Sequence, residues 1–123
     1  MAAHIGEVLA YLQQVFWQAS EERLHVFYCD AAGRVLCDRT VAHGVADGLR
    51  MRSRELLSEA FAVEATGLLL AHNHPSGICR PSEADIRSTR RLATLCREVD
   101  IELLDHFILT QDRGFSMRGG GFL

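Results

Sequence analysis

The chain contains no lysine, and this absence excludes several kinds of chemistry. All thirteen of its basic residues are arginine, against sixteen acidic residues, and the formal net charge is −3 at pH 7. Without lysine the protein forms no Schiff base with a carbonyl substrate and has no P-loop lysine for phosphate. The sequence pI near 6.0 also lacks the basic character of a general nucleic-acid-binding domain. We therefore expect no nucleic-acid partner for this domain alone.

Long apolar runs and paired cysteines are also missing. The longest strictly apolar stretch, Gly67 to Ala71, is far shorter than the ~20 residues of a membrane-spanning helix. Residues 1–20 lack the basic start and unbroken apolar run of a signal peptide. The four cysteines form no CxxC pair, which argues against a zinc ribbon or a thioredoxin-type site. We expect a cytoplasmic protein without a membrane segment, in which Cys29 and Cys96 are buried thiols.

The overall composition is that of a single folded domain. The chain has 123 residues, of which 48% are hydrophobic and 24% are charged. A chain of this length can bury one substantial hydrophobic core but not two independent ones. Residues 1–123 are therefore expected to form one domain.

The spacing of apolar residues predicts alternating helices and strands. Helices are expected over 5–20 and 53–66 and from Ser82 onward, and strands over 24–30, 34–41, 67–71, 101–110 and 115–118. In the second helix Leu56, Ala60 and Phe61 are expected to face the core. The order αββαβαββ predicts a mixed sheet with helices on its faces, an α/β sandwich.

Two histidines follow directly on the apolar strand. In an extended backbone His72 and His74 project to the same side, roughly 6 to 7 Å apart along the chain, so both imidazoles can bind one metal ion. Asp85 lies in the first turn of the helix that begins at Ser82, and the loop between can fold its carboxylate back toward the strand end. Catalytic zinc typically has three protein ligands and one position left for water.

The same residues also have purely structural interpretations. Ser82 and Asp85 match the pattern of a helix N-cap, and a histidine at a strand end is most often structural. The joint spacing H-x-H-x7-S-x-x-D behind an apolar strand favours the metal site. HExxH is absent, which excludes the common helical zinc-protease scaffold, and the contiguous letters HNH do not match the dispersed residues of an HNH nuclease.

This set of residues resembles the JAMM (MPN+) metalloprotease motif, and the segments LLLAHNHPSG, PSEADIRSTRRL and ELLDHFIL are similar to the RadC family. The similarity extends over residues 5–123. It implies a three-layer α/β/α sandwich of the cytidine-deaminase-like type. It also implies Zn²⁺ held by His72, His74 and Asp85. Glu22 matches the family's glutamate before the first strand, which makes it the expected general base.

Three features bear on how far the resemblance extends. Full-length RadC proteins have a helix-hairpin-helix segment ahead of this domain, for which we expect no room here. The loop contains Cys79, which can approach the metal but is more often a surface thiol in such a place. His106 matches a family position, and we expect it to be structural or to contact a ligand rather than to bind the metal.

Together these features predict a zinc-dependent hydrolase that cleaves peptide or isopeptide bonds in a protein or peptide. In the expected mechanism a water is the nucleophile, Glu22 accepts its proton, and Ser82 stabilises the oxyanion by a hydrogen bond. The alternatives are a non-catalytic interaction module of the same MPN fold and a DNA-repair-associated factor. A zinc deaminase would need H-x-E and P-C-x-x-C, and neither pattern occurs.

Overall fold

The computed structural model describes residues 5–16, 21–43 and 52–123 of the chain. Its elements are α1 (Ile5–Phe16), β1 (Arg23–Cys29), β2 (Val35–His43), α2 (Ser53–Ala62), β3 (Gly67–Asn73), α3 (Glu83–Glu98), β4 (Glu102–Leu109) and β5 (Gly114–Ser116). The expected order αββαβαββ is confirmed. The expected continuation of the first helix through residues 17–20 lies outside the described residues.

The strands form one mixed sheet of five strands in the order β2-β1-β3-β4-β5. β1 is antiparallel to both β2 and β3, β3 is parallel to β4, and β4 is antiparallel to β5. The parallel pair requires a crossover connection, and α3 supplies it. All seven residues of the central strand β3 are buried, as its continuous apolar run predicts.

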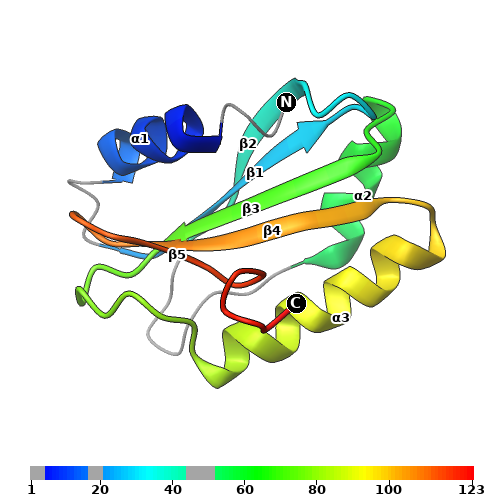
Figure 1. The fold of residues 1–123 in the computed structure, drawn as a ribbon. Helices are drawn as coiled ribbons and strands as arrows, with labels where there is room; N and C mark the ends of the chain where they lie inside the picture. The colour runs from blue at the N-terminus through cyan, green and yellow to red at the C-terminus, as the bar shows by residue number, and fades with distance from the viewer. Residues whose placement is uncertain (1–4, 17–20, 44–51) are drawn as a thin grey trace.

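Helices cover both faces of this sheet (Figure 1). Leu68 and Leu70 of β3 lie in one core cluster with the buried residues of α2 and α3. Leu69 and Ala71 lie in a second cluster, together with Leu12 of α1. Because successive side chains of a strand point to opposite faces, the two clusters are the two sides of the sheet. The fold is therefore the expected three-layer α/β/α sandwich.

The second helix is shorter than its sequence pattern predicts. It ends at Ala62 rather than at residue 66, because Glu64 has a φ of 58° in the left-handed region and the chain turns there into β3. The expectation for Phe61 is wrong, since this side chain is 56% exposed. Leu56 and Ala60 are four residues apart and occupy the buried face, which rotates Phe61 toward solvent. No helix in the described part of the chain is long and apolar enough to span a membrane.

The central strand is longer than expected, and this places the first histidine. β3 continues through Asn73 rather than ending at Ala71. His72 pairs with Leu24 of β1 on one side and with Ile108 of β4 on the other. Strands on both sides therefore hold the backbone of this residue, which lies beyond the strand over 67–71 that the sequence pattern predicts.

Candidate metal centre

The two histidines meet at the carboxyl end of β3. His72 lies within the strand and is fully buried, and the backbone N–H of His74 donates to the carbonyl of Leu109 at 2.8 Å. That bond keeps the chain extended past the end of the strand. His72 and His74 therefore project to the same face, and their Nε2 atoms lie 2.7 Å apart.

Two carboxylates approach this pair of nitrogens from different parts of the chain. Oδ2 of Asp85, in the first turn of α3, lies 3.5 Å from Nε2 of His72 and 3.3 Å from Nε2 of His74. Oε1 of Glu22, which precedes β1, lies 3.8 Å and 3.4 Å from the same two atoms. The expected ligands and the expected base thus surround one point.

A capping box at the start of α3 fixes the Asp85 carboxylate. Oγ of Ser82 accepts a hydrogen bond from the backbone N–H of Asp85 at 3.0 Å, and Oδ2 of Asp85 accepts one from the backbone N–H of Ser82 at 2.8 Å. The structural interpretation of this pair is therefore confirmed. The same Oδ2 atom faces the two histidines. The hydrogen bonds that cap the helix therefore also orient the Asp85 carboxylate toward the histidines.

Hydrogen bonds on the far side of each ring orient the histidine nitrogens. Nδ1 of His74 lies 2.8 Å from the carbonyl oxygen of Ile78. Since a carbonyl only accepts, Nδ1 carries a proton, and in the neutral ring the Nε2 lone pair faces the centre. Nδ1 of His72 lies 2.7 Å from Nε2 of His106, whose Nδ1 lies 2.8 Å from Oγ1 of Thr89. With the Nε2 lone pair of His72 facing the centre, its Nδ1 proton is donated to His106 and that of His106 to Thr89.

The electrostatics of the centre favour a cation. Burial raises the pKa of Asp85, but in the metal-free centre the hydrogen bonds that Nε2–H groups of His72 and His74 make to this carboxylate outweigh burial and hold its pKa well below its usual range. Burial lowers the pKa of His74, yet its hydrogen bond with Asp85 and that with the Ile78 carbonyl raise the net pKa above the ordinary value. Burial, with the neighbouring His72, holds the pKa of His106 well below its usual range. The centre thus combines an ionised carboxylate with a neutral supporting imidazole.

The donor set fits a zinc ion. Imidazole nitrogens and carboxylate oxygens bind Zn²⁺ at roughly 2.0 to 2.2 Å, so two ligand atoms at a tetrahedral angle are about 3.4 Å apart. The distances of 3.3 Å and 3.5 Å from Asp85 to the two histidines match this spacing, and the 2.7 Å between the histidines is shorter. Glu22, His72 and His74 also form a group whose ligand atoms lie within 4.8 Å of one another. Of the two carboxylates, Asp85 is nearer to both imidazoles and is the one fixed by the cap.

A family model described as a RadC-like JAB domain matches residues 3–122. The chain belongs to this family. It is 35% identical over 113 residues to the UPF0758 protein of Vibrio atlanticus, and 39% identical over 113 residues to that of Azotobacter vinelandii. These alignments cover 92% of the chain and 50% of each relative. A UPF0758 protein of Acidithiobacillus ferrooxidans is 38% identical over 114 residues, covering 93% of the chain and 51% of the relative. The chain thus spans about half the length of the curated relatives it matches.

Two further residues of the RadC-like domain support the groups around the centre, and neither was predicted to have a functional role. Oγ1 of Thr89 lies 2.8 Å from Nδ1 of His106 and so supports that ring. Asn73 lies between the two histidines, and its amide bonds to the backbone on either side of Glu22. The signals available in sequence were a threonine four residues after Asp85 and an asparagine between two histidines.

The structure also places the cysteines and the histidine that the sequence singled out outside the ligand set. Sγ of Cys79 donates to the carbonyl of Ile108 at 3.4 Å and is half-buried, so its thiol is directed at the end of β4. Cys29 and Cys96 are buried, as expected, and burial raises the pKa of the Cys96 thiol to about 11. His106 is buried against His72, which agrees with a role beside the ligands.

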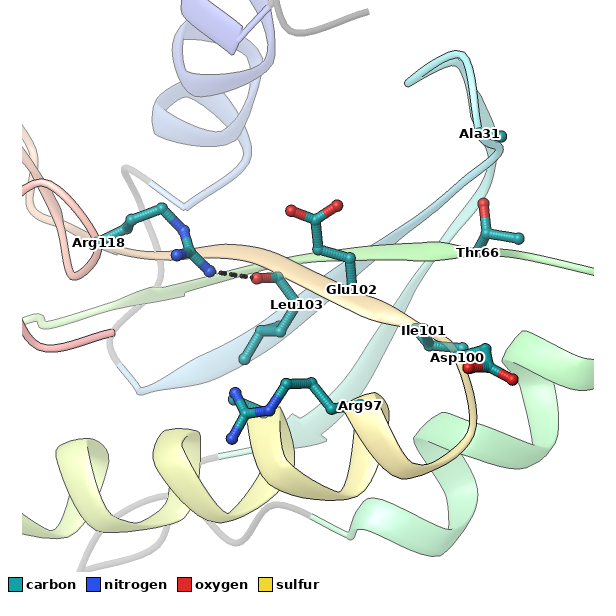
Figure 2. Close-up of a pocket in the computed structure, with 9 residues that line it drawn as sticks. Ala31, Thr66, Arg97, Asp100, Ile101, Glu102, Leu103 and Arg118 are labelled. Atoms are coloured by element: carbon teal, nitrogen blue, oxygen red, sulfur yellow. Dashed lines mark hydrogen bonds between the residues drawn. The ribbon is translucent and has the colours of Figure 1, made fainter.

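The RadC-like domain also has a cavity of about 630 Å³ at the opposite end of β3 and β4 (Figure 2). Arg118 lines this cavity and donates from Nη2 to the carbonyl of Leu103 and from Nε to that of Leu104, at 2.7 Å each. Figure 2 shows Arg97 on α3 below β4, while the carboxylate of Glu102 points away from that helix. The polar groups of this cavity therefore do not gather around one point.

Proposed function

We propose that this domain is a zinc-dependent hydrolase that cleaves peptide or isopeptide bonds in a protein or peptide substrate. The observation that supports the proposal most directly is the arrangement of two imidazole nitrogens and two carboxylates around one point. His72, His74 and Asp85 would hold the metal. Bound Zn²⁺ lowers the pKa of water toward ~7 and polarises a carbonyl group.

Glu22 is the proposed general base. Its side chain is 26% exposed, twice the 13% of Asp85, and it reaches the histidines from the segment before β1. A carboxylate there can accept a proton from the attacking water and return it to the leaving nitrogen. Because His72, His74 and Asp85 suffice for the metal, Glu22 stays available for proton transfer.

Ser82 is the proposed donor to the oxyanion. Its Oγ already accepts the bond from the backbone of Asp85, and this leaves the hydroxyl proton available to a negative oxygen. The amino terminus of α3 adds positive partial charge at the same place. The link between Ser82 and Asp85 in the capping box supports this role, in which the hydroxyl would donate to the developing charge.

The reaction is proposed for the cytoplasm. The four cysteines are free thiols, two of them buried, which fits a reducing compartment. The substrate is proposed to be a protein or peptide rather than a nucleic acid, since the net charge of −3 gives little attraction to phosphate.

The test combines metal analysis with a cleavage screen. Purified protein is expected to contain one zinc per chain and to cleave members of a panel of peptides and isopeptide-linked conjugates in a chelator-sensitive manner. Glu22→Gln is expected to keep the zinc and to lose roughly 10²- to 10⁴-fold in rate, because glutamine cannot accept a proton. The matched control is Glu21→Gln, whose carboxylate lies 3.8 Å from the Arg23 guanidinium.

Two results would contradict the proposal. Near-stoichiometric zinc without any cleavage would favour the interaction module. Zinc loss in Glu22→Gln would make Glu22 a ligand instead of the base.

A further inference from the structure

Asn73 stands between the two histidines but faces the other side of the sheet. Successive side chains of a strand alternate, so the side chain of Asn73 lies on the α1 side while His72 and His74 lie on the α3 side. Asn73 is only 4% exposed. A buried amide is expected to have its donor and its acceptor paired.

Both ends of the Asn73 amide bond to the backbone around Glu22. Oδ1 accepts a hydrogen bond from the backbone N–H of Arg23 at 2.7 Å, and Nδ2 donates one to the carbonyl of Glu21 at 3.0 Å. These two groups belong to the peptide units immediately before and after the Cα of Glu22. One side chain therefore fixes both peptide planes that set the direction of the Glu22 side chain.

Backbone pairing with β3 does not provide this restraint, although Arg23 on its other side lies opposite His43 of β2. The ladder between β1 and β3 begins at Leu24 and His72, so within the described residues Glu21 and Glu22 lie beyond it. The Asn73 amide extends the contact of β1 with β3 by using a side chain in place of the backbone. An aspartate would keep only the acceptor, and a leucine would keep neither group.

We infer that Asn73 is a positioning residue for Glu22, holding the carboxylate against the histidine pair by binding the backbone on both sides of it. The inference rests on the proposed hydrolase function, in which Glu22 is the base. It implies that the carboxyl end of β3 positions the histidine ligands on one face of the sheet. Through Asn73 on the other face, the same strand end positions Glu22.

The first test measures hydrogen exchange of the Arg23 amide in the metal-free and the zinc-loaded protein. Asn73→Ala is expected to speed this exchange roughly tenfold in both forms, because the acceptor at 2.7 Å is removed. The zinc content is expected to stay at the wild-type value. The control is Gln13→Ala, which removes another amide tether, from Nε2 to the carbonyl of Arg113, that does not contact residues 21–23. Unchanged Arg23 exchange in Asn73→Ala would overturn the inference.

The second test measures turnover on a substrate that the wild-type protein cleaves. Asn73→Ala is expected to lower kcat roughly 10- to 100-fold, with KM within about twofold, because a misplaced base slows the chemical step rather than binding. The double variant Asn73→Ala/Glu22→Gln is expected to be no slower than Glu22→Gln alone, since Asn73 acts only through Glu22. Additive losses would indicate a general structural role and overturn the inference.

If Asn73→Ala does not fold, Asn73→Asp is the variant used in both tests. It keeps the acceptor for Arg23 and loses the donor to Glu21, so we expect protected Arg23 exchange together with a reduced kcat. Wild-type kcat in Asn73→Asp would overturn the inference while leaving the hydrolase intact. A wild-type protein that cleaves nothing would contradict the hydrolase instead, and the exchange experiment would still test whether Asn73 holds this backbone.

Discussion

The two ends of β3 and β4 contain polar groups that are arranged in opposite ways. At the carboxyl end Nε2 of His72, Nε2 of His74 and Oδ2 of Asp85 lie 2.7 to 3.5 Å from one another. At the amino end the cavity is about 630 Å³, but Arg118 uses its guanidinium to donate to two backbone carbonyls. The proposed chemistry therefore lies at the end where ligand atoms gather around one point, and not at the end with this cavity. The carboxyl ends of parallel strands are also where α/β proteins commonly bind ligands.

The largest expected effect comes from removing a ligand at the carboxyl end. His72→Ala is expected to lose the zinc and all hydrolysis, because two remaining ligands cannot hold the ion against water. Elemental analysis and the cleavage assay measure both effects. Glu102→Gln in the amino-end cavity is the control, with full zinc and full activity expected. Stoichiometric zinc in His72→Ala would disprove the assignment of the centre.

Acidification is expected to weaken metal binding at this end. The raised pKa of His74 means that a proton competes with the metal already at and above the ordinary histidine pKa of 6.5. The lowered pKa of Asp85 keeps this carboxylate ionised far below that range, so His74 dominates the change. Titration against a competing chelator from pH 8 to pH 6 is expected to show zinc affinity falling by up to about tenfold per pH unit. A flat profile over that interval would contradict the role of His74.

A smaller effect is expected from the residues that support His72. Thr89→Val keeps the shape of the side chain but removes the oxygen that lies 2.8 Å from Nδ1 of His106. Loss of a direct partner of a metal ligand typically weakens metal affinity roughly 10- to 100-fold, and since Thr89 acts through His106 we expect a loss of about tenfold. Thr94→Val on the same helix, which removes an exposed bond to the carbonyl of Arg90, is the matched control. Equal zinc affinity in the two variants would show that His106 needs no support from Thr89.

The smallest effect is expected at the amino end. Arg118→Ala removes two hydrogen bonds to the carbonyls of Leu103 and Leu104 and should lower the free energy of unfolding by about 1 kcal/mol. Chemical denaturation measures this loss. Zinc content and turnover are expected to be those of the wild type, and a loss of either would mean that the two ends are coupled.

Local patterns in the sequence were sufficient for the element order and for part of the centre. Strand and helix periodicities act over neighbouring residues, and so does the capping box of Ser82 and Asp85. The spacing of His72 and His74 is equally local, because alternate residues of any extended segment share a face. The resemblance to the RadC family added Glu22, which composition alone does not distinguish from Glu21.

Only the tertiary structure decided which distant groups meet at the centre. Glu22 reaches His74, 52 positions later in the chain, because β1 and β3 pair antiparallel in a register that brings their ends together. Thr89 contacts His106 because α3 packs on the face of β4 that bears this histidine. The bonds from Asn73 to the backbone of Glu21 and Arg23 likewise depend on strand register. Long-range pairing is a property of the folded core as a whole, and no short window of sequence specifies it.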